Sequence, residues 1–265
     1  MSDSLLANAQ QKIAEGNLAG ALQDLNRALQ SNPGLGIAMF QRGMLHLRMH
    51  NYQQALADLD SAVASGIALA DALGQRSLVK IQLHDYTGAI ADGEEAARLD
   101  PGHFQNYLYQ GLARFNLGEY AASIPCFSEA LRLNPAHTES RRLRGMAYCL
   151  CGQFAEGRKD IETVLTENTQ DDQAWFWRGY LCQQEDDLAG ALEALSRSID
   201  LNAYNKAAFV GRGRAYLGLG DKKKALADFL SAQSLDPNWE VLPDLIREAR
   251  RKEGGRGGIF SIFGS

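Results

Sequence analysis

The chain of 265 residues repeats itself every 34 residues, and this period limits the possible folds more than any other feature. Pro33, Pro101, Pro135 and Pro237 are separated by multiples of 34. Cutting the sequence at this period gives seven windows without an insertion or a deletion. The windows are 2–35, 36–69, 70–103, 104–137, 138–171, 172–205 and 206–239. Such a period predicts a stack of small units, each buried against its neighbours.

Small residues recur at two places in the window, which predicts two closely packed helices. Position 8 reads Ala9, Gly43, Ser77, Gly111, Gly145, Gly179 and Gly213. Position 20 reads Ala21, Ala55, Ala89, Ser123, Gly157, Ala191 and Ala225. Positions 4, 8 and 11 share one face of a first helix, and positions 20, 24 and 27 share one face of a second.

Turn residues divide each window into a helix, a short turn and a second helix. Glycine followed by a polar residue, as in Gly16-Asn17 and Gly118-Glu119, suits the end of one helix and the start of another. A polar residue and proline close several windows, as in Asn32-Pro33 and Asp236-Pro237. Each window therefore predicts one helical hairpin.

These columns resemble the tetratricopeptide repeat family over residues 2–239. The family pattern has a large residue at position 4, small residues at 8, 20 and 27, an aromatic residue at 17 and proline at 32. Position 17 supplies Tyr52, Tyr86, Tyr120 and Phe154. The departures are Arg141 at position 4, Lys222 at 17, and Thr169 and Ala203 in the proline column. The resemblance implies an all-α, right-handed superhelical solenoid of seven hairpins, whose first helices line the concave surface.

Two segments follow the repeats. Residues 240–253 predict a capping helix with Pro243 in its first turn and an apolar face that covers the last hairpin. Residues 254–265 form a glycine-rich tail that ends in the apolar segment 259–263. We expect either a frayed terminus or an apolar segment that binds the groove of the same or a neighbouring molecule. In the second case, the tail provides a route to self-association.

Composition and charge narrow the function. The sequence is 45% hydrophobic and 22% charged, as in folded proteins. The net charge of −5 disfavours nucleic acid, because affinity for phosphates needs a positive surface. No stretch is long enough to span a membrane, and residues 1–10 lack a secretory pattern. We expect a cytoplasmic protein without nucleic-acid binding or stable membrane insertion.

We predict no catalytic, cofactor or metal site. The five histidines do not gather at one repeat position, so we do not expect them to converge on a site. Cys149 and Cys151 have the spacing of a metal pair, but on a helix residues two apart point about 200° apart. They and the other two cysteines, Cys126 and Cys182, are expected to be reduced thiols.

Arginine at position 7 accompanies aspartate at position 23 in four windows, whereas the fourth window has Gln110 and Cys126 instead. This co-occurrence predicts an ion pair, either between the two helices of one hairpin or between neighbouring repeats.

The function is expected to be that of a non-catalytic scaffold or adaptor, whose concave groove binds an apolar or amphipathic protein segment. By the family resemblance, positions 5 and 9 of the first helices face the concave groove together with positions 2, 6, 12 and 13. Positions 5, 6 and 9 are more apolar than a solvated face requires. The predicted groove residues are Phe40, Met44, Leu78, Leu108, Tyr109, Leu112, Arg142, Phe176, Trp177 and Tyr180. Some of them can instead pack against the next repeat.

Two alternative roles for the same groove are those of a co-chaperone and of an assembly factor for a membrane or secretion complex. The family's clamp for acidic chaperone tails needs lysine at position 5 and asparagine at position 9. Neither residue occurs in its column here, which disfavours binding of that type.

Overall fold

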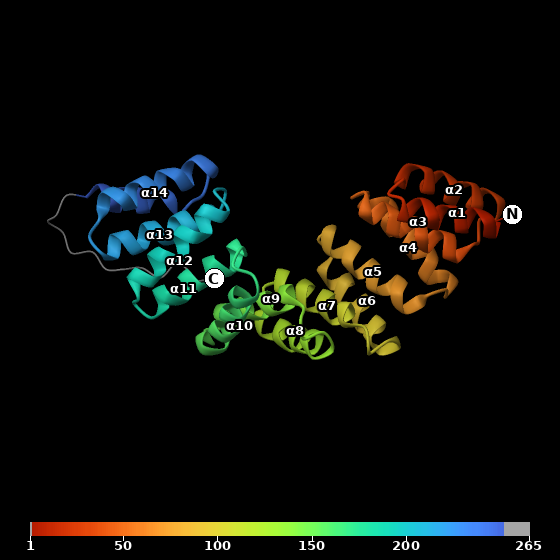
Figure 1. The fold of residues 1–265 in the computed structure, drawn as a ribbon, viewed down its shortest axis with the longest axis horizontal. Coiled ribbons are helices and arrows are strands. Elements are labelled where there is room, and N and C mark those ends of the chain that lie inside the picture. The colour runs from red at the N-terminus through yellow and green to blue at the C-terminus, as the bar shows by residue number, and fades with distance from the viewer. Residues whose placement is uncertain (1, 252–265) are drawn as a thin grey trace. The chain divides into compact units, whose positions relative to one another are not determined.

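The computed structural model describes residues 2–251, which form fifteen α-helices and no strand (Figure 1). The first eight helices are α1 (Ser2–Ala14), α2 (Leu18–Ser31), α3 (Gly36–Arg48), α4 (Tyr52–Ser65), α5 (Leu69–Gln82), α6 (Tyr86–Leu99), α7 (Phe104–Asn116) and α8 (Tyr120–Leu133). The others are α9 (Thr138–Leu150), α10 (Phe154–Glu167), α11 (Asp172–Gln184), α12 (Leu188–Leu201), α13 (Lys206–Gly218), α14 (Lys222–Leu235) and α15 (Leu242–Arg250).

The helices follow the predicted period. The second helix of every hairpin begins 34 residues after the one before it, from Leu18 in α2 to Lys222 in α14. The chain divides into two compact units at Gly157 and Arg158. The first unit contains α1 to α9 and the second contains α11 to α15, while α10 crosses the division.

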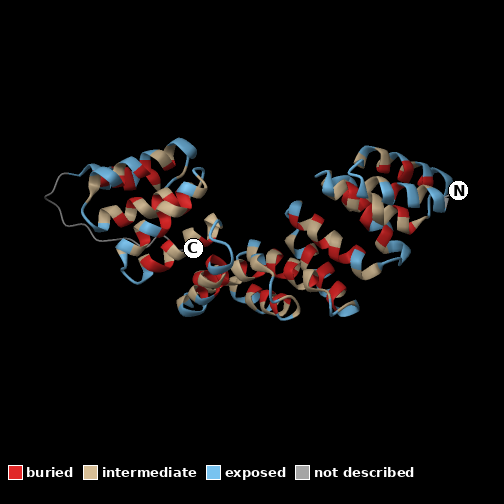
Figure 2. Cartoon of the chain, in the orientation of Figure 1, coloured by how far each residue is buried: buried red, intermediate tan, exposed pale blue. Residues whose placement is uncertain are grey.

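The hairpins pack through the predicted small positions. Ala21, Ala55 and Ala89 are fully buried, as are the large residues Leu25 and Leu59 that follow at position 24. Figure 2 shows this pattern in each unit, with buried residues on the inner faces of the helices and exposed residues outside. Gly43 is required here, because a Cβ at this position would lie 2.9 Å from Cγ of Leu59.

The turn inside each hairpin needs a left-handed backbone at position 15. Gly16, Gly118, Gly152 and Gly220 have φ between 75° and 81° there. Three hairpins place other residues in the same conformation: His50, His84 and Asp186, with φ of 59°, 62° and 58°. Two of the five histidines therefore occupy turn positions, where Nδ1 of His50 lies 2.9 Å from Oη of Tyr52 and Nδ1 of His84 lies 2.8 Å from Oη of Tyr86.

Three of the predicted arginine–aspartate pairs are seen within single hairpins. The shortest N–O distances are 2.6 Å for Arg42–Asp58, 2.7 Å for Arg76–Asp92 and 2.7 Å for Arg212–Asp228. The aspartates are buried, with 5–6% of their surface exposed. Hydrogen bonds to these carboxylates raise the pKa of each arginine.

The same arginines also contact the preceding hairpin, at repeat position 25, which lies on its second helix. Arg76 Nη1 donates to Asp60 at 2.8 Å, and Arg212 Nη1 donates to Ser196 at 3.1 Å. Where position 23 is alanine, Arg178 pairs with Glu162 at position 25 instead, at 3.3 Å. Both predicted alternatives, pairing within a hairpin and pairing between hairpins, are therefore present.

Helix α15 covers the last hairpin. Leu242, Leu245, Ile246 and Ala249 are 1–7% exposed and pack with Phe229 and Val210 in one core cluster. Pro243 lies in the first turn, where its missing N–H has no intrahelical partner to lose. The helix is shorter than residues 240–253, and the predicted tail 254–265 lies outside the described residues.

Candidate partner-binding surface

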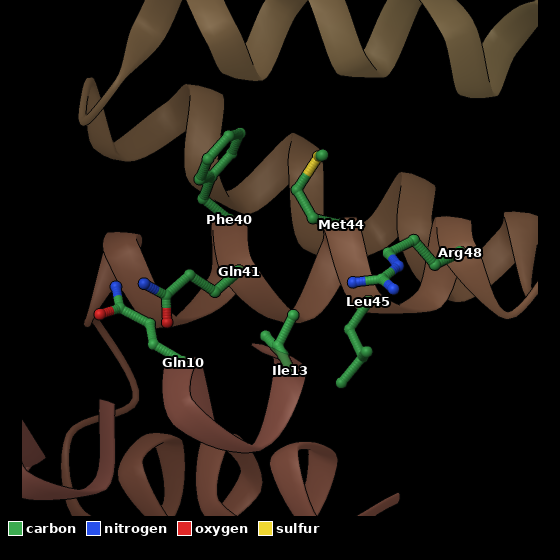
Figure 3. Close-up of a pocket in the computed structure, with 7 residues that line it drawn as sticks. All are labelled: Gln10, Ile13, Phe40, Gln41, Met44, Leu45 and Arg48. Atoms are coloured by element: carbon green, nitrogen blue, oxygen red, sulfur yellow. The ribbon is translucent and has the colours of Figure 1, made fainter. Parts of the chain in front are cut away.

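A pocket of about 250 Å³ lies between the first helices of the first two hairpins (Figure 3). Helix α1 contributes Gln10 and Ile13. Helix α3 contributes Phe40, Gln41, Met44, Leu45 and Arg48. Six of the seven residues occupy repeat positions 5, 6, 9, 12 and 13, which the family resemblance assigns to the concave surface. The pocket therefore forms on the helices that the sequence selects for partner binding.

The polar groups of this pocket lie at its margins. Figure 3 places the amides of Gln10 and Gln41 on one side and the guanidinium of Arg48 on the other, with Ile13 between them. The Oε1 atom of Gln41 is buried and has no hydrogen-bond partner. An unsatisfied buried acceptor is unfavourable, by about 1–3 kcal/mol.

The apolar lining differs in accessibility. Ile13 and Met44 are half-buried, whereas Leu45 is only 1% exposed and belongs to the core. Arg48 is exposed and can pair with a carboxylate in a two-bonded geometry.

The predicted residues of the first unit divide into two groups. Phe40 and Met44 line the pocket, although Phe40 also packs against the core of the second and third hairpins. Leu78 is half-buried. Arg142 is half-buried as well, with Nη1 3.8 Å from the sulfur of Met146.

The remaining predicted residues of this unit mainly stabilise the fold. Leu108 is only 6% exposed and packs with Phe127 and Leu143, so it offers almost no surface to a partner. Tyr109 and Leu112 pack against the same core cluster. Burial raises the pKa of Tyr109, and the charge of Glu139 adds to the effect. For these residues, packing against neighbouring helices explains the apolar side chain.

In the second unit, the three predicted aromatic residues on α11 form a cluster. The rings of Phe176 and Trp177 have centroids 5.6 Å apart, and those of Trp177 and Tyr180 are 5.3 Å apart, both in edge-to-face geometry. Trp177 is 7% exposed, whereas Phe176 and Tyr180 are half-buried. Trp177 therefore supports its two neighbours more than it offers surface of its own.

Sequence reasoning did not single out Gln41 or Arg48, two of the three polar residues that line the pocket. Their positions, 6 and 13, were assigned to the concave surface, but nothing in the sequence distinguishes Gln41 from Gln75 one repeat later. The distinguishing property is an acceptor buried without a donor, which is visible only in three dimensions.

The four cysteines are free thiols, with Cys149 and Cys182 buried. Within residues 2–251, no group of three side chains is arranged to hold a metal ion. None of the fifteen described helices has the length and apolarity that crossing a membrane requires.

Stacked helical hairpins with a pocket on their first helices define an α-solenoid. A model of the tetratricopeptide repeat matches residues 40–104, 108–149 and 152–206, and a second model of the same repeat matches residues 207–238. The chain belongs to the tetratricopeptide repeat family, as its sequence columns indicated. No curated protein matches it.

Solved structures share the fold at low sequence identity. A tetratricopeptide repeat protein from Parabacteroides merdae is 21% identical, with a TM-score of 0.68 over 94% of this chain and 99% of that one. The pilF protein of Pseudomonas aeruginosa is 18% identical, with a TM-score of 0.69 over 80% and 97%. The anaphase-promoting complex hetero-tetramer Cut9–Hcn1 gives 15% identity and a TM-score of 0.71, over 95% of this chain and 56% of that one.

Proposed function

We propose that the chain is a non-catalytic scaffold of the cytoplasm, which binds a protein partner through the first helices of its hairpins. Tetratricopeptide repeats generally mediate protein–protein interaction, and the pocket between α1 and α3 supports this role here. The observation that carries the proposal is the mostly apolar pocket between α1 and α3, with Gln10, Gln41 and Arg48 at its margins. The free thiols are consistent with a reducing compartment.

The preferred ligand is an extended or amphipathic segment with an apolar side chain next to a carboxylate. The apolar side chain contacts Ile13 and Met44, and the carboxylate pairs with Arg48. Phe176 and Tyr180, in the second unit, form a separate candidate contact patch of aromatic anchors.

Selection from a random peptide library on the full chain tests this proposal, with the enriched peptides then titrated by fluorescence anisotropy. Gln41→Leu removes the amide at the pocket margin at nearly constant volume and is expected to weaken binding about tenfold, because a polar contact with the peptide is lost. Gln75→Leu is the matched control, since Gln75 has the same repeat position and is also half-buried. Equal affinities for both variants would contradict the proposed pocket.

A role in assembling larger complexes is the second candidate. Cut9–Hcn1 belongs to a multi-protein complex and shares the fold over nearly the whole chain, which supports such a role. Self-association through residues 259–263, outside the described part, also stays a prediction. Sedimentation of the full chain and of a chain ending at Gly258 tests it: a dimer that survives truncation would remove this route.

A further inference from the structure

Arg214 on α13 carries a positive charge without an ion-pair partner. It occupies repeat position 9 of the last hairpin, the position of Gln10 and Met44 in the pocket between α1 and α3. Its Nε atom is buried without a hydrogen-bond partner, and no carboxylate within residues 2–251 forms an ion pair with its guanidinium. A charged group that loses hydration without a partner is unfavourable, and an incoming anion removes this cost.

The carboxylates of α15 leave this charge uncompensated. Burial lowers the pKa of Arg214 to about 10, and Glu248 opposes this effect from a distance, without pairing. Arg214 is therefore still positively charged at neutral pH. Asp244, one turn before Glu248, is already paired with Arg247 at 2.7 Å. Since Arg214 is half-buried and not enclosed, a ligand can reach the outer part of its guanidinium.

Helices α11 and α13 meet in the same way as the two helices of the pocket. The side chain of Gln183 on α11 donates to the backbone oxygen of Gly211 on α13 at 2.8 Å, which holds the two helices together. These two residues have repeat positions 12 and 6, which are the positions of Ile13 and Gln41 in the pocket. The surface between α11 and α13, which we call the α11–α13 face, therefore corresponds to the pocket between α1 and α3.

The residues of the α11–α13 face differ in chemistry from those of the pocket. Helix α13 has small residues at positions 6, 10 and 13, namely Gly211, Ala215 and Gly218. Long side chains at these positions of α13 therefore do not cover Arg214. Tyr180, at position 9 of α11, is half-buried and offers part of an aromatic ring. The face combines a cation with an aromatic side chain.

We propose that the α11–α13 face binds an acidic residue of a protein partner, with Arg214 pairing with its carboxylate and Tyr180 contacting an apolar side chain a few residues away. A guanidinium donates two parallel hydrogen bonds to a carboxylate, which favours this ligand over a neutral amide. The inference rests on the proposed function only in that the partner is a protein, because the face shares no residue with the pocket between α1 and α3. The family's clamp for acidic tails has asparagine at position 9, so arginine here defines a different recognition site.

An NMR titration of the full chain with two tetrapeptides tests this proposal. Both are acetylated and amidated, with the sequences Asp-Gly-Gly-Phe and Asn-Gly-Gly-Phe, which place the charge and the ring about 10 Å apart in an extended chain. The first peptide is expected to shift the Nε–Hε resonance of Arg214 and to bind about tenfold more tightly than the second. Arg214→Met is expected to remove this preference, and Arg214→Lys to retain only part of it.

Glu248→Gln supplies an arm in which binding should improve. The acidic peptide is expected to bind this variant at least about twofold more tightly, because a like charge near Arg214 is removed. A purely structural role for Arg214 predicts no such gain, so unchanged or weaker binding to Glu248→Gln would count against the proposal.

Arg197→Met is the matched control, because Arg197 is also half-buried but lies on the second helix α12. This control and Gln41→Leu are both expected to keep the preference for the acidic peptide, so failures of the α11–α13 face and of the pocket appear in different variants. Circular dichroism checks that every variant is folded. Equal affinities of the wild type for the two peptides, or an equal shift of the Arg214 resonance with sodium acetate at the same concentration, would overturn the proposal.

Discussion

Arg42 and Asp58 form an ion pair with two hydrogen bonds: Nε donates to Oδ2 at 2.8 Å and Nη2 to Oδ1 at 2.6 Å. The remaining donor, Nη1, bonds to Oδ1 of Asn26 at 2.7 Å. One side chain on α3 therefore connects α4 of its own hairpin with α2 of the hairpin before. Arg76 and Arg212 repeat this arrangement, so three hairpins are each joined to the preceding hairpin through the arginine column.

A double-mutant cycle measures this coupling. Arg42→Met and Asp58→Asn are each expected to lower the free energy of unfolding by about 2–3 kcal/mol, because a half-buried charge loses its partner. The double variant should lose at least about 1 kcal/mol less than the sum. The exposed pair Arg98–Glu95 is the control and should show no measurable coupling in the same urea titrations. Additive losses at Arg42 and Asp58 would contradict the bridging role.

The left-handed turn position allows a matched exchange between adjacent hairpins. Asp186→Gly is expected to stabilise the second unit by about 1 kcal/mol, because glycine adopts φ near 58° without steric conflict. Gly220→Asp should destabilise it by a similar amount. Thermal unfolding of both variants measures the direction of each change in stability. A loss of stability in Asp186→Gly would contradict the expected strain at this turn.

Helix α15 should stabilise the last hairpin through its buried face. Ile246→Ala is expected to lower the free energy of unfolding by about 2–3 kcal/mol, from lost burial and the cavity left behind. Arg247→Ala, next along the helix and 67% exposed, should change it by less than about 0.5 kcal/mol. Similar effects of the two changes would mean that α15 does not cover the core.

His46 gives the first unit a weak dependence on pH. Burial lowers its pKa, opposed by Asp58 and assisted by Arg42, and its Nδ1 has no hydrogen-bond partner. Between the folded pKa and the unfolded value of 6.5, the unfolded state binds more protons, so stability falls as the pH drops through this range.

The melting temperature of the wild type should therefore fall more between pH 7.5 and pH 5.5 than that of His46→Gln. An NMR titration of His46 reports the pKa directly. A value at or above 6.5, or an equal fall in both proteins, would refute this assignment.

The repeating part of the fold can be predicted from the sequence, because each repeat position requires a residue of a given size on a given face of its helix. Gly111 shows why. A Cβ there would lie 2.6 Å from Cε1 of Phe127, so a large residue at position 24 requires a small residue at position 8. The left-handed turns at His50 and His84 follow from alignment with glycines and not from residue type.

The pocket is less predictable, since repeat position does not determine burial. Leu108 has the same repeat position as Phe40, yet it packs against Leu143 of the next hairpin while Phe40 reaches the pocket. Which apolar side chain stays accessible depends on the size of its neighbours on three helices. The unpaired acceptor of Gln41 depends on the same local packing.

Hydrogen–deuterium exchange of the full chain, with and without a peptide selected from the library, tests the central claim that the first helices bind the partner. Binding is predicted to slow exchange in α1 around Gln10–Ile13 and in α3 around Phe40–Arg48, with the second helices α2 and α4 changing less. Protection confined to α2 and α4, or none in α1 and α3 at saturating peptide, would contradict the account.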